Sequence, residues 1–207
     1  MKRKTLIVGA IEANCTILWE DPSAAWIIDP GADAEQITGY LKEAGLKPGL
    51  VAFTHGHFDH IGAVNDILAA YPGVPVHIHP LDVQIAFHPA NCWMPVYPAT
   101  KRPATLVEDL CEGAVLECGG ISARILHTPG HTPGSVCFYF EREKMLASGD
   151  TLFSGSFGRT DFPGGSMEQM KLSLKRLGTL PPETAVVCGH GADTDIRTEK
   201  GRNGYMS

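Results

Sequence analysis

The sequence lacks paired cysteines, a surplus of basic residues and long apolar runs. Its cysteines lie far apart, with no C-x-x-C pair, at Cys15, Cys92, Cys111, Cys118, Cys137 and Cys188. This spacing argues against both a disulfide scaffold and a zinc ribbon. We therefore expect buried, reduced thiols and a cytoplasmic protein.

The charge balance is acidic. Lysine and arginine number 17 against 23 aspartates and glutamates, which gives a formal net charge of −6. A protein that grips a phosphate backbone needs a basic surface, so a nucleic-acid partner is not expected. No apolar run approaches 18 residues, and the basic N-terminal stretch is interrupted at Glu12 with no cleavage site after it, so we expect neither a membrane span nor a signal peptide.

What the sequence does contain is a succession of short apolar segments. With 207 residues and 43% hydrophobic content, the chain can bury a substantial core, and we expect a single domain over residues 1–207. Nine segments rich in β-branched and aromatic residues predict strands at 5–8, 15–19, 24–29, 49–53, 74–79, 122–126, 135–140, 144–148 and 184–188. Apolar spacings of three and four predict helices at 34–44, 61–70, 81–87 and 166–177, with Asp33 and Ser166 as N-caps and Gly45 after the first helix. This pattern favours an α/β or α+β fold of two mixed β-sheets flanked by helices.

Histidines and aspartates gather where four of these strands end. The stretch T-H-G-H-F-D-H places His55, His57, Asp59 and His60 directly after one strand, and His131, Asp150 and His190 follow three others. The carboxyl ends of strands are where layered folds build their sites. Extended residues two apart project to one side, so His55 and His57 can hold one ion while Asp59 and His60 face a neighbouring position.

The chemistry of these donors predicts a metal site. Imidazole and carboxylate without thiolate suit zinc, iron or manganese, and a catalytic zinc commonly keeps three protein ligands. Seven donors with one shared carboxylate supply two divalent metal ions. Zinc is the expected metal, with iron and manganese as alternatives.

The motifs also carry a family resemblance. T-H-G-H-F-D-H, H-T-P-G-H-T-P-G, S-G-D-T-L-F with G-R-T-D-F-P-G-G, and C-G-H-G resemble the metallo-β-lactamase superfamily in order and spacing, and within it the glyoxalase II-like hydrolases. The resemblance implies an αββα sandwich with a dinuclear site. It places the first ion on His55, His57 and His131, the second on Asp59, His60 and His190, and Asp150 between them. Asp29 matches an aspartate that supports a ligating imidazole, although D-P-G is also an ordinary turn sequence.

Differences between this sequence and other members of the superfamily narrow the choice of subfamily. True metallo-β-lactamases of this superfamily lack a metal-binding aspartate where this chain has Asp150, and the di-iron flavoproteins have a glutamate in place of His57. The tRNA-processing members would want basic exosites, which the acidic balance disfavours. Full-length glyoxalase II enzymes add a helical C-terminal region that helps to hold glutathione, whereas this sequence ends 17 residues after His190.

We therefore expect a metal-dependent hydrolase acting on a small-molecule thioester or ester, most simply a thioester such as S-lactoylglutathione. A hydroxide held between the ions would attack the carbonyl carbon, with Asp59 as ligand and water-orienting carboxylate. Three alternatives stay open: a persulfide dioxygenase with a single iron on His55, His131 and Asp150, a lactonase or other esterase, and a non-catalytic metalloprotein. A monomer or a homodimer fits equally.

Some polar and aromatic residues outside this cluster have two interpretations each. His77 with His79, and His88 with Cys92, could bind metal, but structural roles are favoured for both pairs. Trp93 and Tyr97 lie in the proline-rich stretch 88–103, which we expect to be an ordered loop or lid, and either cover substrate or anchor that loop. Arg159 either pairs with Asp161 or binds an acidic group of a substrate.

Overall fold

The chain folds into two facing β-sheets. The computed structural model describes residues 1–206, and within this range each sheet has six strands. The first sheet has the order β1 (Lys2–Val8), β2 (Ala13–Trp19), β3 (Ala25–Ile28), β4 (Pro48–Ala52), β5 (Val76–His77) and β6 (Leu106–Val107). The second has the order β12 (Thr194–Asp195), β11 (Ala185–Cys188), β10 (Met145–Gly149), β9 (Val136–Phe140), β8 (Ile121–His127) and β7 (Val115–Cys118).

Both sheets are mixed. In the first sheet β1, β2 and β3 pair antiparallel, whereas β3 to β6 run parallel. In the second, only the β10 and β11 pair is parallel. The parallel strands matter for function, because their carboxyl ends reach the same edge of the molecule.

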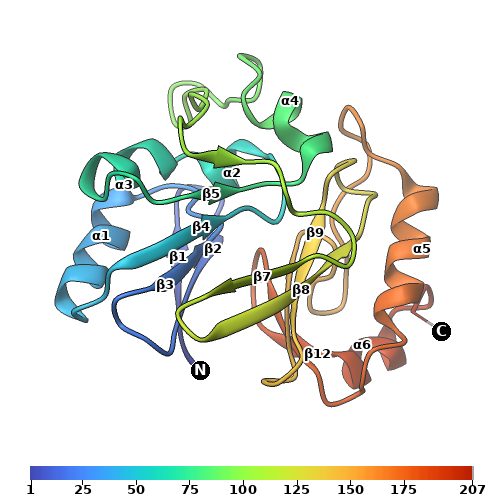
Figure 1. The fold of residues 1–207 in the computed structure, drawn as a ribbon. Helices are drawn as coiled ribbons and strands as arrows, with labels where there is room; N and C mark the ends of the chain where they lie inside the picture. The colour runs from blue at the N-terminus through green and yellow to red at the C-terminus, as the bar shows by residue number, and fades with distance from the viewer. Residues whose placement is uncertain (207) are drawn as a thin grey trace.

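Helices cover the outer faces of the sheets. Helices α1 (Ala34–Glu43), α2 (Phe58–Ile61) and α3 (Val64–Ala70) belong to the side of the first sheet, and α5 (Met167–Leu177) and α6 (Ile196–Arg202) pack on the second (Figure 1). Helix α4 (Val83–Ala86) follows a 3₁₀ turn, Pro80–Asp82. The expected αββα sandwich is confirmed.

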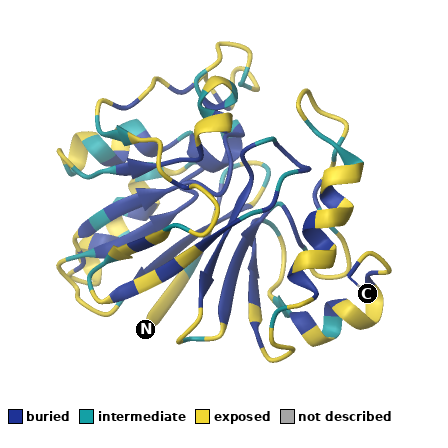
Figure 2. Ribbon diagram, turned by 45° about the vertical axis from the view of Figure 1, so that its right-hand side comes forward, coloured by how far each residue is buried: buried dark blue, intermediate teal, exposed yellow. Residues whose placement is uncertain are grey.

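Strand alternation explains how one chain builds three apolar layers. In β3, Trp26 and Ile28 face the second sheet, whereas Ile27 faces the helices. Trp26 packs edge-on against Phe138 and Phe140, at ring-centroid distances of 6.4 and 5.7 Å. The central strands are therefore buried on both faces, as Figure 2 shows, and this explains why their sequences are continuously apolar.

The structure corrects several sequence predictions. The expected helix 61–70 is two helices, because Gly62 ends α2 where the chain passes within van der Waals reach of Gly31. The expected strand 74–79 pairs over only two residues, and the helix expected at 81–87 is a 3₁₀ turn followed by the short α4. Strands β6, β7 and β12 and helix α6 were not predicted, since they are short or mostly polar.

Two of the three residues predicted at helix ends behave as expected, and the third does not cap its helix. Ser166 caps α5 as expected, by accepting from the backbone N–H of Gln169, and Gly45 has a left-handed conformation after α1. Asp33 stands at the N-cap of α1 but is left-handed and does not cap the helix. Its carboxylate instead accepts from the N–H of Gly9 at 2.7 Å.

All six cysteines are free thiols, and three of them, Cys15, Cys137 and Cys188, are buried. Burial raises the pKa of Cys137 to about 11. In the described part of the chain, no helix combines the length and apolarity needed to cross a bilayer.

Candidate metal centre

The seven predicted donors meet at one edge of the sandwich. They follow the carboxyl ends of β4, β8, β10 and β11, so the first sheet contributes four of them and the second sheet three. The structure thus brings together all seven side chains that the sequence singled out.

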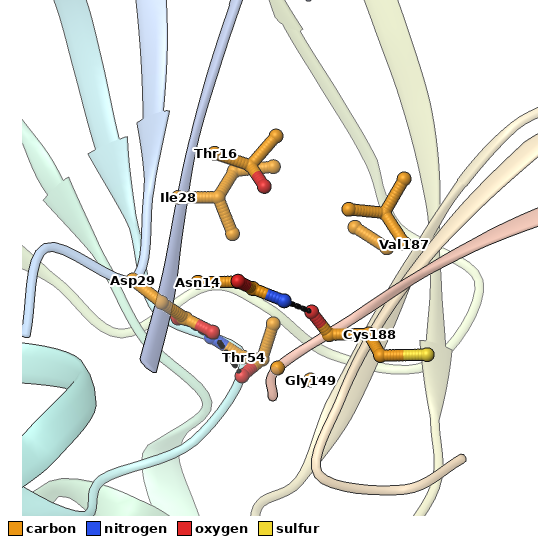
Figure 3. Close-up of a pocket in the computed structure, with 10 residues that line it drawn as sticks. Asn14, Thr16, Ile28, Asp29, Thr54, Gly149, Val187 and Cys188 are labelled. Atoms are coloured by element: carbon orange, nitrogen blue, oxygen red, sulfur yellow. Dashed lines mark hydrogen bonds between the residues drawn. The ribbon is translucent and has the colours of Figure 1, made fainter. Parts of the chain in front are cut away.

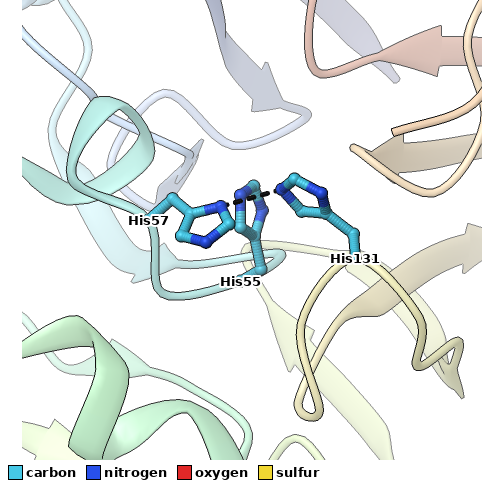
Figure 4. Close-up of side chains that lie close together, drawn as sticks. All are labelled: His55, His57 and His131. Carbon is cyan, nitrogen blue, oxygen red and sulfur yellow. Dashed lines mark hydrogen bonds between the residues drawn. The ribbon is translucent and has the colours of Figure 1, made fainter. Parts of the chain in front are cut away.

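One group of donors consists of His55, His57 and His131. Their nearest ring nitrogens lie within 4.8 Å of one another. Figure 4 shows the three imidazoles turned toward a common point, with Nδ1 of His57 2.8 Å from Nε2 of His131. Two of the three come from the loop after β4 and the third from the loop after β8, so the group bridges the two sheets.

A second group consists of Asp59, His60 and His190, again with donor atoms within 4.8 Å of one another. Nε2 of His60 lies 3.2 Å from Nε2 of His190, which in turn lies 3.4 Å from Oδ2 of Asp59. Asp59 and His60 belong to the one-turn helix α2, which turns them away from His57. The heptad thus contributes to both groups, and His55 and His60 also lie close together, in a third group with Asp29.

Asp150 lies between the two groups. Its Oδ2 is 3.5 Å from Nε2 of His131 and its Oδ1 is 3.4 Å from Nε2 of His60. A single carboxylate can therefore reach both groups. Close backbone packing places it there, because a Cβ on Gly189 would come within 2.2 Å of Oδ1 of Asp150.

Hydrogen bonds fix which nitrogen three of the imidazoles present. Nδ1 of His131 donates to the carbonyl of Arg159 at 2.7 Å, Nδ1 of His190 to the carbonyl of Ile11 at 3.2 Å, and Nδ1 of His60 to Asp29 at 3.0 Å. In the neutral form of each of these rings, Nε2 therefore carries the lone pair and faces the centre. His57 differs, since it presents Nδ1 to the centre.

Asp29 orients two histidines at once. Its Oδ1 accepts from the backbone N–H of Thr54 and its Oδ2 from the Thr54 hydroxyl, both at 2.7 Å (Figure 3). Because that hydroxyl donates to Asp29, its oxygen accepts from Nδ1 of His55 at 3.0 Å. Of the two interpretations of D-P-G, support of a ligating imidazole is therefore the one the structure bears out, even though Asp29 has a left-handed backbone (φ 53°).

Two further supporting residues were missed by sequence reasoning. Asp82 is fully buried and accepts from the N–H groups of Gly56 and Gly134 and from the Thr132 hydroxyl, at 2.8, 2.6 and 2.6 Å. It thereby joins the loop of His55 and His57 to the loop of His131. Nothing in its local sequence, H-P-L-D, signals this role.

Asn14 is the other missed residue. Its side-chain amide donates to the carbonyls of Cys188 and Gly191, both at 2.9 Å, on either side of His190. Figure 3 shows its side chain reaching from β2 to Cys188 of the second sheet. Both residues line a cavity of about 10 Å³ between the sheets. Asn14 therefore holds the His190 loop against β2.

The electrostatics of the centre favour positive charge between the donors. Burial lowers the pKa of His57 to about 3, helped by His131, and lowers that of His55 well below its ordinary value, so both are neutral. Burial opposes a charge on His60 too, but Asp150, Asp59 and Asp29 outweigh it and raise its pKa to about 10. Against the same burial penalty, His60 and His190 lower the pKa of Asp59.

The donor set fits divalent metal ions. Nε2 of His55 and Oδ1 of Asp150 are buried and make no hydrogen bond to any residue in the described range 1–206. Buried polar atoms without a partner are costly, and those of histidine and aspartate are metal-ligand atoms. The neutral His55 and His57 and the ionised Asp59 are already in the protonation states that a metal requires, whereas His60 would release a proton on binding one.

The remaining singled-out residues have structural partners. Nδ1 of His77 lies 2.9 Å from Asp109, and His79 stacks on His127 at 4.3 Å, so the structural interpretation of both holds. Tyr97 is buried, and its hydroxyl accepts from the N–H of Ile11, which anchors the proline-rich loop to the turn before β2.

Arg159, Trp93 and His88 also contact neighbouring parts of the protein. Trp93 stacks on Tyr97, and Nδ1 of His88 accepts from the N–H of Ala90. Arg159 pairs through two nitrogens with Asp161, as one of the two interpretations expected.

The two-sheet sandwich and the histidine and aspartate clusters at its edge define a metallo-hydrolase. The chain belongs to the metallo-β-lactamase superfamily, whose family model matches residues 8–190. It is 37% identical to the probable metallo-hydrolase YqgX of Bacillus subtilis, over 100% of this chain and 98% of the relative. It is 33% identical to the hydroxyacylglutathione hydrolase GloC of Haemophilus influenzae, over 100% of this chain and 99% of the relative.

Solved structures agree on the fold. The crystal structure of BLEG-1, a B3 metallo-β-lactamase, superimposes with a TM-score of 0.90 at 35% identity and covers all of both chains. The crystal structure of TTHA1623 in a di-iron-bound form gives a TM-score of 0.86 at 36% identity, over 98% of this chain and 99% of that one. A dinuclear metal site is thus known on a closely similar backbone.

Proposed function

We propose that the protein hydrolyses an activated acyl bond of a small molecule, a thioester such as S-lactoylglutathione, with two metal ions. The observation that carries the proposal is the arrangement of seven donors as two groups with Asp150 between them. The name of the GloC relative, a hydroxyacylglutathione hydrolase at 33% identity over the full chain, supports the acyl thioester as substrate class.

In this proposal His55, His57 and His131 hold one ion and Asp59, His60 and His190 the other, with Asp150 shared. Zinc is the expected metal, and the di-iron relative supports iron as the alternative. Two divalent ions bound there lower the pKa of a water between them and stabilise negative charge on a carbonyl oxygen.

The protein's own residues orient the metal-binding side chains and a water. Asp29 and Asp82 hold the imidazoles, and Asp59, whose pKa is lowered by His60 and His190 despite burial, stays ionised to orient a water. A thiolate is a good leaving group, so a thioester needs no separate proton donor. This suits a centre in which every imidazole would either bind a metal ion or donate a hydrogen bond to the protein, so that none is left to protonate a leaving group.

A second candidate is β-lactam hydrolysis, which Asp150 disfavours but which the structure of the B3 metallo-β-lactamase BLEG-1 favours, because it covers the whole chain at 35% identity. Opening a β-lactam expels an amine nitrogen, which must gain a proton. Thioester and β-lactam substrates therefore make different demands on the same site, and one assay panel separates them.

The test is metal analysis of the purified protein, coupled to rates on a thioester, a lactone, a β-lactam and a phosphodiester. We expect two ions per chain and the highest kcat/KM on the thioester, with Asp59→Asn lowering it at least a hundredfold and the exposed control Asp66→Asn leaving it unchanged. Full metal loading without thioester turnover would overturn the proposal. A single iron with oxygen uptake on glutathione persulfide would instead establish the dioxygenase alternative.

A further inference from the structure

A second cavity opens beside the donor cluster. It has a volume of about 590 Å³ and lies between helix α4, residues 88–92 and residues 162–163. A hollow of about 290 Å³ lies over the donors themselves, and the two spaces share His57, Phe58 and Phe162. A molecule whose reacting carbonyl sits over the donors can therefore extend directly into the second cavity.

The walls of this cavity are largely carbon. They include the side chains Phe58, Ile85, Ala90, Cys92, Phe162 and Pro163. Among the residues that the structure describes, no lysine, arginine, aspartate or glutamate lines it. An ionised group entering the cavity would lose hydration without gaining a partner of opposite charge.

One polar side chain of the wall, Asn91, is already engaged in hydrogen bonds. The Asn91 amide donates to the carbonyls of Gly56 and Ala86, at 2.8 and 3.0 Å. Arg159, which lines only the hollow over the donors, is bound to Asp161 and lies 3.8 Å above the ring of Phe162. Neither side chain is free to receive a carboxylate.

The wall that faces the donors is also fixed in place. The ring of Phe162 stands edge-on to His57 at 5.7 Å and is covered on one face by Arg159. Asn91 ties residues 88–92 to the loop of His55 and His57. The cavity is thus preformed, as small-molecule sites usually are.

We propose that this cavity binds an uncharged aliphatic or aromatic arm of the thioester, on the acyl or the thiol side of the scissile bond. The inference rests on the proposed function and narrows its substrate class to thioesters with an apolar arm, in place of S-lactoylglutathione. A lactoyl group is small and polar and leaves most of the cavity unfilled, and the carboxylates of a glutathionyl arm find no cation there. The preferred substrates are therefore thioesters with an apolar arm, cleaved by water to a carboxylic acid and a free thiol.

The test compares thioesters of N-acetylcysteamine that differ only in the acyl group: acetyl, phenylacetyl and succinyl. The acetyl thioester of benzyl mercaptan places the aromatic arm on the thiol side instead. We expect kcat/KM at least about tenfold above that of the acetyl compound for one of the two aromatic thioesters, and no such gain for the charged succinyl compound. Which aromatic compound gains identifies the side that enters the cavity.

The variant Ile85→Glu puts a carboxylate into the cavity wall and should bring the aromatic-to-acetyl ratio close to one. Ile85→Ala, a milder change, should reduce the ratio only in part and covers the case that the glutamate disturbs folding. Leu172→Glu makes the same change at a 65% exposed position on α5, outside the cavity, and should leave the ratio at its wild-type value.

A binding measurement keeps this inference separate from the proposed function. The non-hydrolysable S-benzyl thioether of N-acetylcysteamine should bind to the wild-type protein, and about tenfold more weakly to Ile85→Glu. Isothermal titration calorimetry measures both affinities. Equal rates on all thioesters, or thioether binding that Ile85→Glu leaves unchanged, would overturn the apolar arm. If no thioester is hydrolysed but the thioether binds as expected, the proposed function fails and the apolar site stands.

Discussion

Oδ2 of Asp29 lies 3.0 Å from Nδ1 of His60, in a place where both side chains are almost completely shielded from solvent. The same carboxylate fixes His55 through the Thr54 hydroxyl. One aspartate at the end of β3 therefore sets the orientation of an imidazole in each donor group. Such partners of ligating histidines commonly change metal affinity when they are altered.

Asp29→Asn should weaken metal binding by about 10- to 100-fold, because an amide holds the Nδ1 protons less strongly than a carboxylate. Competition with a chelator of known affinity measures the effect. The exposed Asp66→Asn provides the matched control and should bind metal as the wild type does. Unchanged affinity in Asp29→Asn would show that Asp29 serves only the turn.

Asp82→Asn should destabilise the protein by roughly 3 kcal/mol. The carboxylate accepts hydrogen bonds from two backbone N–H groups and one hydroxyl, and an amide, with a single oxygen, cannot accept all three. Urea denaturation with metal removed gives the free energy of unfolding. Because Asp82 joins the loops of His57 and His131, metal affinity should fall as well. A loss of stability without any loss of metal affinity would contradict the positioning role.

Gly189→Ala should displace Asp150, because the added Cβ would lie 2.2 Å from its Oδ1 and 2.8 Å from the carbonyl carbon of Gly149. We expect at least a tenfold loss of metal affinity. Gly201→Ala is the control: its Cβ would meet no described atom within 4 Å, and in α6 it should add about 0.5–1 kcal/mol of stability. Normal metal content in Gly189→Ala would refute the close packing argued for Asp150.

The metal-free protein should lose stability as the pH falls from about 6.5 toward 4, in part because of His79. Burial, with His127 stacked on it, lowers the pKa of His79 to about 4, so the unfolded chain binds a proton in this range that the folded chain resists. Nδ1 of His79 also accepts a hydrogen bond from the backbone N–H of Leu81 at 3.1 Å, and protonation of Nδ1 would break this bond.

His79→Asn keeps an acceptor for Leu81 and does not titrate. Its unfolding free energy should therefore vary less with pH, by up to the 1.4 kcal/mol per pH unit that one proton can contribute. Thermal or urea denaturation at intervals between pH 4 and 7 provides the comparison. If the unfolding free energies of the two proteins depend on pH in the same way, His79 does not contribute to the loss of stability in acid.

The sequence was most informative where covalent spacing decides the outcome. His55 and His57 fall on one side and Asp59 and His60 on the other, because an extended segment gives way to one helical turn within seven residues. Long, strongly periodic helices such as α5 were also predictable. Short elements such as β12 and α6 were not, since two to seven largely polar residues carry little periodic signal.

The sequence by itself indicated the seven candidate ligands and the layered fold, because these follow from the ends of strands and from strand alternation, and the family resemblance implied how the ligands divide. Only the tertiary structure decided which residues hold the donors and what surrounds them. Asn14 reaches Cys188 across 174 positions and Asp82 reaches Thr132 across 50. Such contacts depend on how two sheets pack, and so does the apolar cavity beside His57, whose walls come from segments with no shared motif.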